Sequence, residues 1–316
     1  MKKQPLPASS QPIYIGVDFA KEKFDYHGPD LQGSLPNEPA AHRRFLALLP
    51  PGAQLICEST GSCHRALVQT AHAKGWAVTV VNPRQVRDFI KGLGGRAKSD
   101  PIDAFYLQEF GRLVRPSADV PPSAATLALR ELVVARQQAV LERSTLLLQQ
   151  ADQSVPALRT LTKARLQRLT KDLEKLEKLI LQTMAQEPVL AAKAARLAEV
   201  KGVGPVTAAT CVALFPELGT LSRGEAAALL GVAPYDDDSG KLHKPRHIAG
   251  GRFRLRSALY MAALSATRCN PILRRFFQHL RAQKKPSKVA LTAVMRKLII
   301  LLNHLLQKPD FQLSST

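Results

Sequence analysis

Four carboxylates in the first third of the chain each follow a short apolar or glycine-rich segment. Asp18 ends the run "IYIGVD", Glu58 ends "AQLICE", and Asp100 and Asp103 follow the loop "KGLGGRAKSD". Carboxylate oxygens are hard ligands that suit Mg²⁺ or Mn²⁺. Two such ions can clamp the attacking and leaving oxygens of a phosphodiester. If the four acids converge, they favour metal-assisted cleavage of a nucleic-acid backbone.

Each of these acids also has an ordinary structural explanation. Asp100 can cap a helix N-terminus, acids in a first helical turn are favoured by the helix dipole, and Glu58 can be the buried partner of an arginine. Asp100 and Asp103 are three residues apart, so on a helix they share a face. Two strand ends combined with this pair favour one shared metal site over four separate structural roles.

The elements that must position these acids indicate an α/β domain. We predict strands at 13–18, 53–58 and 76–83, with "KFDYHG" as the hairpin partner of the first, and helices at 40–49, 62–74, 84–91 and after the glycine-rich loop. Strands come first and then alternate with helices, which is typical of this class. Strand ends in such a domain can converge on the helix that begins near Asp100.

A second, helical part follows the proline-rich stretch "RPSADVPPSA" (115–124), which is a natural linker. From about 125 to 186, apolar residues recur at helical spacing among many charges, and Pro156 predicts a turn or kink between two helices. We interpret this segment as a helical hairpin or coiled coil with an interaction role. The division expected is a disordered leader (1–12), an α/β domain (13–118), a helical segment (119–188) and a helical C-terminal domain (189–316).

The stretch "EVKGVGPVTAATCVALFP" places Gly202 and Gly204 between two helical patterns. This is the pattern of a helix-hairpin-helix, whose glycine turn presents backbone N–H groups to a phosphate. An ordinary helix–helix corner explains the same residues about as well.

The charge of the chain indicates a polyanionic partner. Lys and Arg total 45 against 25 acids, which gives a net charge of +20 and a pI near 10.2. No Asp or Glu occurs from Lys241 through Lys308. A single-sign stretch of this length favours phosphate contact. The cations that we select as nucleic-acid ligands are Lys241, Lys244, Arg246, Arg252, Arg254 and Arg256.

Nothing in the sequence favours a membrane or an oxidising compartment. The longest apolar run, "LIILL" (298–302), is followed by Asn303 and His304. The N-terminal "MKKQPLPASSQP" lacks the apolar region of a secretory signal. The four cysteines form no CxxC pair, which fits reduced thiols in the cytoplasm.

Several motifs, in order along nearly the whole chain, resemble one family. "IGVDFAKEKFD", "CESTG", "VVNPRQVRDF" and "KSDPIDA" resemble the RuvC-like DEDD domain of the insertion sequence 110 family of transposases, which is related to the Piv DNA invertases. "VKGVGPVTAATCVA", "ALLGVAPYDDDSG" and "GGRFRLRSALYMAA" resemble the C-terminal transposase domain of that family.

The resemblance implies an RNase H-like N-terminal domain in which Asp18, Glu58, Asp100 and Asp103 bind Mg²⁺. It also implies that Ser239, in the Ser-Gly motif, attacks the DNA backbone and forms a covalent phosphoserine. The implied partners are donor and target DNA, a structured bridge RNA, and further copies of the chain, as dimers that assemble into a tetramer. The residues alone do not select Ser239, because a Ser-Gly in a polar loop is usually a turn.

Two other functions stay open from the residues. A RuvC-like nuclease would use the same acids to hydrolyse branched DNA with water. An architectural DNA-binding protein would use them for structure only. The acid quartet argues against the architectural role, and the Ser-Gly motif with its C-terminal domain argues against simple hydrolysis.

Overall fold

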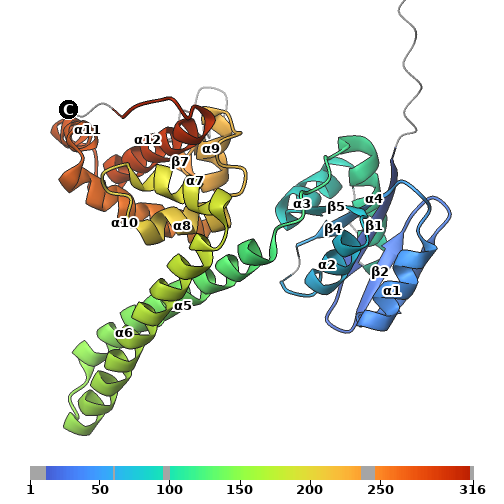
Figure 1. Cartoon of the computed structure of the whole chain (residues 1–316), viewed down its shortest axis with the longest axis horizontal. Coiled ribbons are helices and arrows are strands. Elements are labelled where there is room, and N and C mark those ends of the chain that lie inside the picture. Colours follow the sequence, from blue (N-terminus) through green and yellow to red (C-terminus); the bar gives the residue numbers. More distant parts are fainter. Residues whose placement is uncertain (1–11, 60, 95–99, 236–245, 314–316) are drawn as a thin grey trace, which may run out of the picture. The chain divides into compact units, whose positions relative to one another are not determined.

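The two halves of the chain fold as separate units. The computed structural model describes residues 12–59, 61–94, 100–235 and 246–313, with side chains in the helix at 100–114 described from Asp103 onward. Residues 1–121 form one unit and residues 122–316 the other. Figure 1 shows strands and helices in the first and almost only helices in the second. The boundary falls within the proline-rich stretch.

A five-stranded sheet forms the centre of the first unit, in the order β3-β2-β1-β4-β5. Its strands are β1 (Ile13–Phe19), β2 (Lys23–His27), β3 (Gln32–Pro36), β4 (Ala53–Glu58) and β5 (Ala77–Val81). The first three form an antiparallel meander, whereas β4 and β5 continue the sheet in parallel with β1. The α/β prediction is confirmed. The sequence did not predict β3, because its exposed "QGSLP" lacks an alternating apolar pattern.

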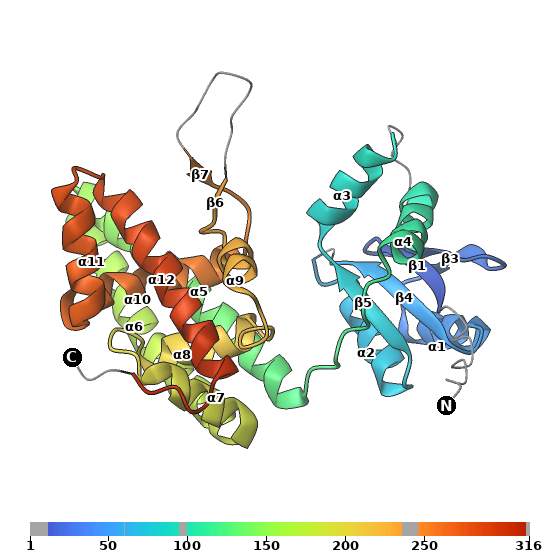
Figure 2. The same cartoon turned by 90° about the horizontal axis from the view of Figure 1, so that it is seen from above.

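Helices cover both faces of this sheet, as Figure 2 shows. They are α1 (Pro39–Leu48), α2 (Arg65–Ala73), α3 (Pro83–Gly92) and α4 (Asp100–Val114). Phe45 of α1 and Leu67 of α2 share a core with Val17, while Leu107 of α4 shares the other core with Ile56. Because β1 and β4 are buried on both faces, they appear in the sequence as continuous apolar runs.

The second unit is built from helices. They are α5 (Ala124–Asp152), α6 (Pro156–Ala185), α7 (Pro188–Ala198), α8 (Pro205–Leu214), α9 (Arg223–Leu230), α10 (Phe253–Cys269), α11 (Pro271–Ala282) and α12 (Ser287–Gln307). A short ribbon of β6 (Pro234–Tyr235) and β7 (His247–Ile248) adds the strands described in this unit. Pro156 opens α6, where its missing N–H costs nothing, so it marks a turn between α5 and α6.

Helix α12 is long and apolar enough, by length and composition, to cross a membrane, and it is the one described helix that meets this test. We expected no segment of that length, because polar residues follow "LIILL". Half of the apolar span is buried inside the structure, and Leu298 and Leu302 are fully buried. Buried Asn303 also accepts from the Gly219 N–H and donates to the Leu221 carbonyl oxygen. These contacts are those of a core helix.

Candidate active site

Asp18 and Glu58 lie at the same edge of the sheet, on neighbouring strands. β1 and β4 pair in parallel with Val17 opposite Cys57, and each acid directly follows one member of that pair. Neighbouring strands are about 4.8 Å apart, and both acids are half-buried. The register therefore brings together the two acids that end their apolar runs.

Both carboxylates point to the face of the sheet that α4 covers. Side chains alternate along a strand, so Asp18 shares the face of Gly16, and Glu58 shares the face of Ile56. A Cβ added at Gly16 would overlap the backbone carbonyl oxygen of Ala104 in α4. Glycine at this position lets α4 lie directly on β1, on the same side as the two acids.

Helix α4 runs antiparallel to β1 across this face. A Cβ added at Gly111 would lie 2.7 Å from the Tyr14 ring, early in β1. A Cβ added at Gly16, later in β1, would lie 2.5 Å from the backbone nitrogen of Gln108. Moving forward along the strand therefore means moving toward the N-terminus of the helix.

The same packing places the first turn of α4 opposite Asp18. Gly16 faces the middle of the segment from Ala104 to Gln108. From Gly16 to Asp18 the strand advances by about 6.6 Å, which corresponds to about four to five helix residues at ~1.5 Å each. The position opposite Asp18 thus falls between residues 100 and 103.

Asp103 belongs to this first turn and is half-buried. Asp100 is the first residue of α4, but its side chain lies outside the described residues. Asp18, Glu58 and Asp103 are thus gathered at one end of β1, from three different elements. Their oxygen donors fit a hard divalent cation. Among the described side chains, however, no three Asp, Glu, His or Cys groups are close enough together to hold a metal ion.

Asp25 is a neighbouring acid that the sequence analysis did not select. It pairs directly across β1–β2 with Asp18, so the two side chains lie on the same face. Its exposed fraction is only 5%, and Lys23 Nζ lies 3.1 Å from its Oδ2. The signal was the alternation in "KFDYH", whose polar residues occupy the α4 side. On that side His27 Nδ1 donates to Gln108 Oε1 of α4, at 2.5 Å.

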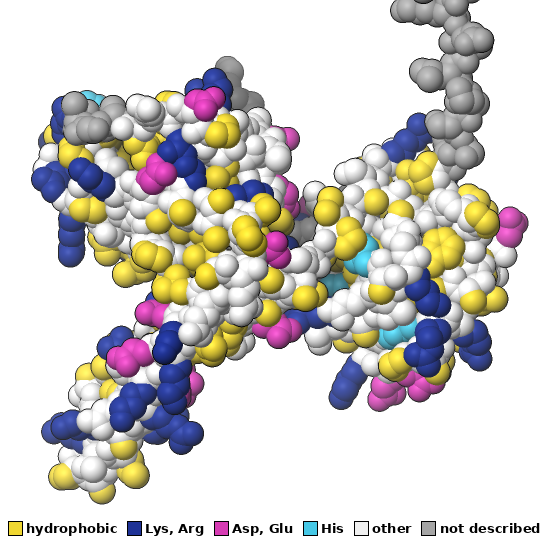
Figure 3. All heavy atoms as spheres, viewed as in Figure 1, with side chains coloured by type: hydrophobic (Ala, Val, Ile, Leu, Met, Phe, Trp, Pro, Cys, Tyr) yellow, Lys and Arg dark blue, Asp and Glu magenta, His cyan; other side chains and the backbone are white. Residues whose placement is uncertain are grey.

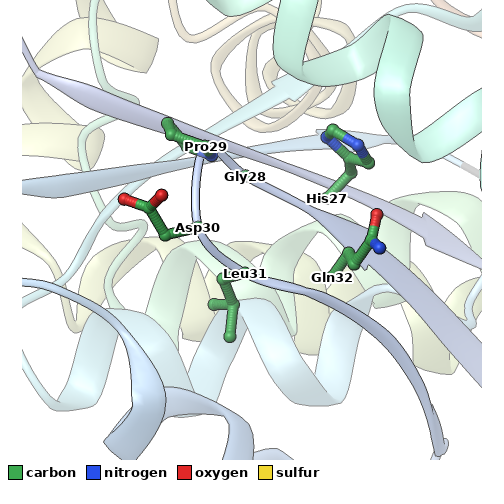
Figure 4. Close-up of a pocket in the computed structure, with 6 residues that line it drawn as sticks. All are labelled: His27, Gly28, Pro29, Asp30, Leu31 and Gln32. Carbon is green, nitrogen blue, oxygen red and sulfur yellow. The ribbon is translucent and has the colours of Figure 1, made fainter.

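A surface hollow at the β2–β3 turn is not part of this site. It is lined by residues 27–32, whose side chains Figure 4 shows around the turn. This turn follows the C-terminal end of β2, whereas Asp25 lies in the middle of that strand, beside Asp18. None of the three described acids lines the hollow.

In the second unit, the two glycines of the α7–α8 turn differ in their surroundings. Gly202 has a φ of 107° and packs so closely on α10 that an added Cβ would lie 2.6 Å from the Ala266 Cβ. Gly204 is the residue before α8, and an added Cβ there would meet open space. Packing explains Gly202, and Gly204 leaves the start of α8 open.

Two of the selected arginines contact acceptors within their own unit. Arg252 donates to Glu217 Oε2 and Oε1 at 2.7 and 2.5 Å and to the Leu214 carbonyl oxygen, and its guanidinium lies over the Phe215 ring. Arg256 donates to the carbonyl oxygens of Gly231 and Gly250. Both cations therefore hold helices and turns together.

Arg256 takes part in a glycine contact at the base of the β6–β7 ribbon. Gly231 has a φ of 79° and Gly251 a φ of 73°. A Cβ added at Gly231 would overlap the Gly250 carbonyl oxygen, and a Cβ added at Gly251 would overlap the backbone nitrogen of Gly231. Beyond them, Tyr235 pairs with His247. Both ends of the ribbon are thus fastened to the helical core.

The structure describes two of the four remaining selected cations. Arg254 is exposed on the first turn of α10, and Arg246 is exposed just before β7. Lys241, Lys244 and Ser239 lie outside the described residues. The structure thus describes three of the four acid side chains of the expected site and not the serine.

Comparisons with known proteins match both halves of the chain. Residues 15–149 match the model of the DEDD domain of IS110 transposases, and residues 194–278 match that of the transposase IS116/IS110/IS902 family. The chain belongs to the IS116/IS110/IS902 family of transposases. It is therefore a DNA-cleaving and DNA-joining enzyme, and its first unit is an RNase H-like DEDD domain that implies a divalent metal.

The transposase is also similar to curated proteins along most of its length. It is 26% identical to the pilin gene-inverting protein of Moraxella lacunata and 27% identical to that of Moraxella bovis, in each case over 90% of this chain and 93% of the relative. It is 28% identical to a probable family 20 transposase of Pseudomonas aeruginosa, with the same coverage.

Proposed function

We propose that this transposase cuts and rejoins DNA through a covalent phosphoserine on Ser239, with divalent ions held by Asp18, Glu58, Asp100 and Asp103. One observation carries the acid half: the strand register sets Asp18 beside Glu58 and opposite the first turn of α4. The Ser-Gly motif and the family match support the serine half.

In the proposed step, Ser239 Oγ attacks the phosphorus of one phosphodiester and the bond to the 3′ oxygen breaks. The serine proton ends on that oxygen, which leaves as a free 3′-hydroxyl, while the 5′-phosphate stays on the serine. One phosphate ester replaces another, so attack by a 3′-hydroxyl can rejoin a strand without ATP. Bound Mg²⁺, or Mn²⁺, would neutralise phosphate charge and ease loss of the hydroxyl proton.

The proposal includes two nucleic-acid partners in a cytoplasmic, nucleoid-associated reaction. DNA is the substrate, and a structured guide RNA is the second polyanion, which the net charge of +20 can accommodate. Open backbone N–H groups beside Gly204, as in a helix-hairpin-helix, and the cations Lys241, Lys244, Arg246 and Arg254 would contact phosphates.

We also propose that copies of the chain assemble, as dimers and then a tetramer, through the outer part of the α5–α6 coiled-coil hairpin. Its inner part is occupied, since Leu129 and Ile180 pack with α8. Its outer part exposes apolar side chains, including Leu148 at 72% and Leu161 at 63%, and Figure 3 shows them interspersed with cations along the hairpin. Light scattering should give a smaller mass for a variant with Glu at both leucines, and an unchanged mass would contradict this assembly.

Mapping of the covalent adduct tests the central proposal. Wild-type enzyme incubated with Mg²⁺ and labelled DNA should yield a denaturation-resistant adduct whose modified peptide contains Ser239. Ser239→Ala should keep its fold and its DNA affinity, because removing one hydroxyl from a polar Ser-Gly segment costs little stability, and it should form no adduct. The matched control is Asp236→Asn, which lies between Pro234 and Ser239 in the sequence. This variant should only slow adduct formation.

Two results would overturn the phosphoserine. One is an adduct on a residue other than Ser239. The other is cleavage by Ser239→Ala that leaves only free 5′-phosphate ends, which is what a hydrolytic RuvC-like nuclease would produce.

A further inference from the structure

We propose that the exposed basic face of α3, formed by Arg84, Arg87 and Lys91, binds the phosphate backbone of the DNA strand that is cut. The inference rests on the proposed function in one respect only, since it takes the acids of the first unit as the place of cleavage. Neither these three residues nor α3 is among the nucleic-acid ligands selected from the sequence.

The location of α3 is set by the strand that precedes it. Val81 ends β5 and lies directly opposite Glu58 of β4 in the parallel register. The Ser59 N–H also donates to the Val81 carbonyl oxygen, at 3.1 Å. Helix α3 begins two residues later, at Pro83, with the Asn82 side chain capping the Arg84 N–H. Its first turn therefore starts at the sheet edge that holds the acids.

The packing of α3 determines which of its faces meets solvent. Val86 is 2% exposed and belongs to the core beneath α4, and the rings of Phe89 and Phe110 lie 5.3 Å apart. With 3.6 residues per turn, Arg84, Arg87 and Lys91 fall within about 60° of one another on the opposite side. All three are exposed.

The positive charge of this face is largely uncompensated. Asp88 is the one acid in α3, and its Oδ2 lies 3.9 Å from Arg84 Nε between two side chains that are 65% and 69% exposed. Such a pair contributes little. Arg87 and Lys91 have no carboxylate at ion-pair distance among the residues that the structure describes. By contrast, Arg112 of α4 donates to Glu109 through both Nε and Nη2, the latter at 2.7 Å.

The dimensions and location of the face favour the backbone of one DNA strand. Arg84 and Lys91 are seven residues apart, or about 10.5 Å along the helix axis. Along the axis of a duplex, this spans about three nucleotide steps of one strand, at ~3.4 Å each. Since the reaction at the neighbouring acids cuts DNA, the polymer that passes this face is the DNA substrate.

The salt dependence of DNA binding tests the inference in the full-length protein. The variant is Arg87→Gln with Lys91→Gln, and the matched control is Arg43→Gln with Arg44→Gln. The control pair is exposed on α1, which packs on the other face of the sheet, and it removes the same charge. Fluorescence anisotropy with a labelled DNA duplex, without divalent ions, gives log K against log salt. The slope should fall by about 1.8 in magnitude for the α3 variant, at ~0.9 per phosphate contact, and stay at the parental value for the control.

Three outcomes would overturn the inference. An unchanged slope in the α3 variant removes this face from the DNA interface. An equal fall in both variants shows a net-charge effect rather than a binding face. A loss of affinity for a structured RNA probe, with duplex binding intact, assigns the face to RNA. Because binding is measured without cleavage, the DNA-binding result does not depend on whether the phosphoserine mechanism is correct.

Discussion

In the first unit, charged side chains gather at the open edge of a sheet, whereas in the second unit the ion pair of Arg252 and Glu217 ties helices together. Asp18 and Glu58 are held side by side by strand register, and the nearby exposed cations Arg87 and Lys91 of α3 have no carboxylate at ion-pair distance among the described residues. Arg252 and Glu217, by contrast, bind each other through two hydrogen bonds. A high content of basic residues therefore does not by itself show which surface binds DNA.

The difference leads to a rule for the arginines of this transposase. A cation that already satisfies buried carbonyl or carboxylate oxygens stabilises the fold, and its removal acts first on the free energy of unfolding. An exposed cation without such partners is available to phosphate, and its removal acts first on binding. The acids of the first unit represent a third case, in which removal acts on the chemical step.

The largest effect is expected from the acids. Asp18→Asn and Asp103→Asn should each lower strand cleavage by several orders of magnitude in the presence of Mg²⁺, because a neutral amide neither binds the metal strongly nor offsets its charge. DNA affinity without divalent ions should stay close to the wild-type value. Gel assays of strand cleavage, with anisotropy for binding, measure the two quantities.

Asp30→Asn, at the exposed β2–β3 turn, is the control for these variants and should retain full cleavage. If both acid variants cleaved DNA at the wild-type rate, the acids of the first unit would have no catalytic role. The proposed difference between the two units would then be wrong.

A moderate effect on stability is expected from Glu217. Burial alone would raise the pKa of this carboxyl, but the hydrogen bonds and charge of Arg252 outweigh burial, so the pKa lies below its ordinary value. A carboxyl with a depressed folded-state pKa stabilises the protein above its unfolded-state pKa, and this contribution disappears as the pH falls through the folded-state value. Wild-type stability should therefore decrease below about pH 4.5, near the ordinary glutamate pKa.

Glu217→Gln should unfold more easily at pH 7, by about 1–2 kcal/mol, and should show a flatter pH dependence. Urea denaturation at a series of pH values measures both. Glu142→Gln is the matched control, because its pair with Arg165 is 3.6 Å long and exposed on both sides. Equal losses in the two variants would show that partner geometry does not separate structural from surface charges.

The smallest effect is expected from single arginines of α10. Arg254→Gln should lower the magnitude of the salt slope for DNA by about 0.9 and leave the denaturation midpoint unchanged. Arg256→Gln should do the reverse, since its guanidinium serves the carbonyl oxygens of Gly231 and Gly250. If both variants change only the slope, the contacts of Arg256 are dispensable for the fold.

The sequence predicted the strand-end acids because their location depends on local patterns. An apolar run that ends in Asp18 or Glu58 already implies a carboxylate at a strand end. Parallel pairing of the two strands then sets these carboxylates side by side. Asp25 was missed because its importance depends on cross-strand register, which no local pattern contains. Composition also does not reveal that Arg252 and Arg256 contact acceptors on α8 and in the turns after α8, after α9 and before α10. Ser239 was found by family resemblance alone and lies outside the described residues.

The paired glycines beneath the β6–β7 ribbon have a consequence for how such enzymes diversify. Gly231 and Gly251 lie main chain to main chain, and Arg256 bridges the carbonyl oxygens of Gly231 and Gly250. The connection from Tyr235 to His247 therefore leaves and re-enters the helical unit at a fastened base. In general, doubling the length of a flexible connection between two fixed ends costs only about 0.6 kcal/mol of closure entropy. Insertions and new sequences between these strands are thus compatible with an unchanged helical unit, and a foreign peptide placed there should be tolerated by the fold even where it abolishes the reaction.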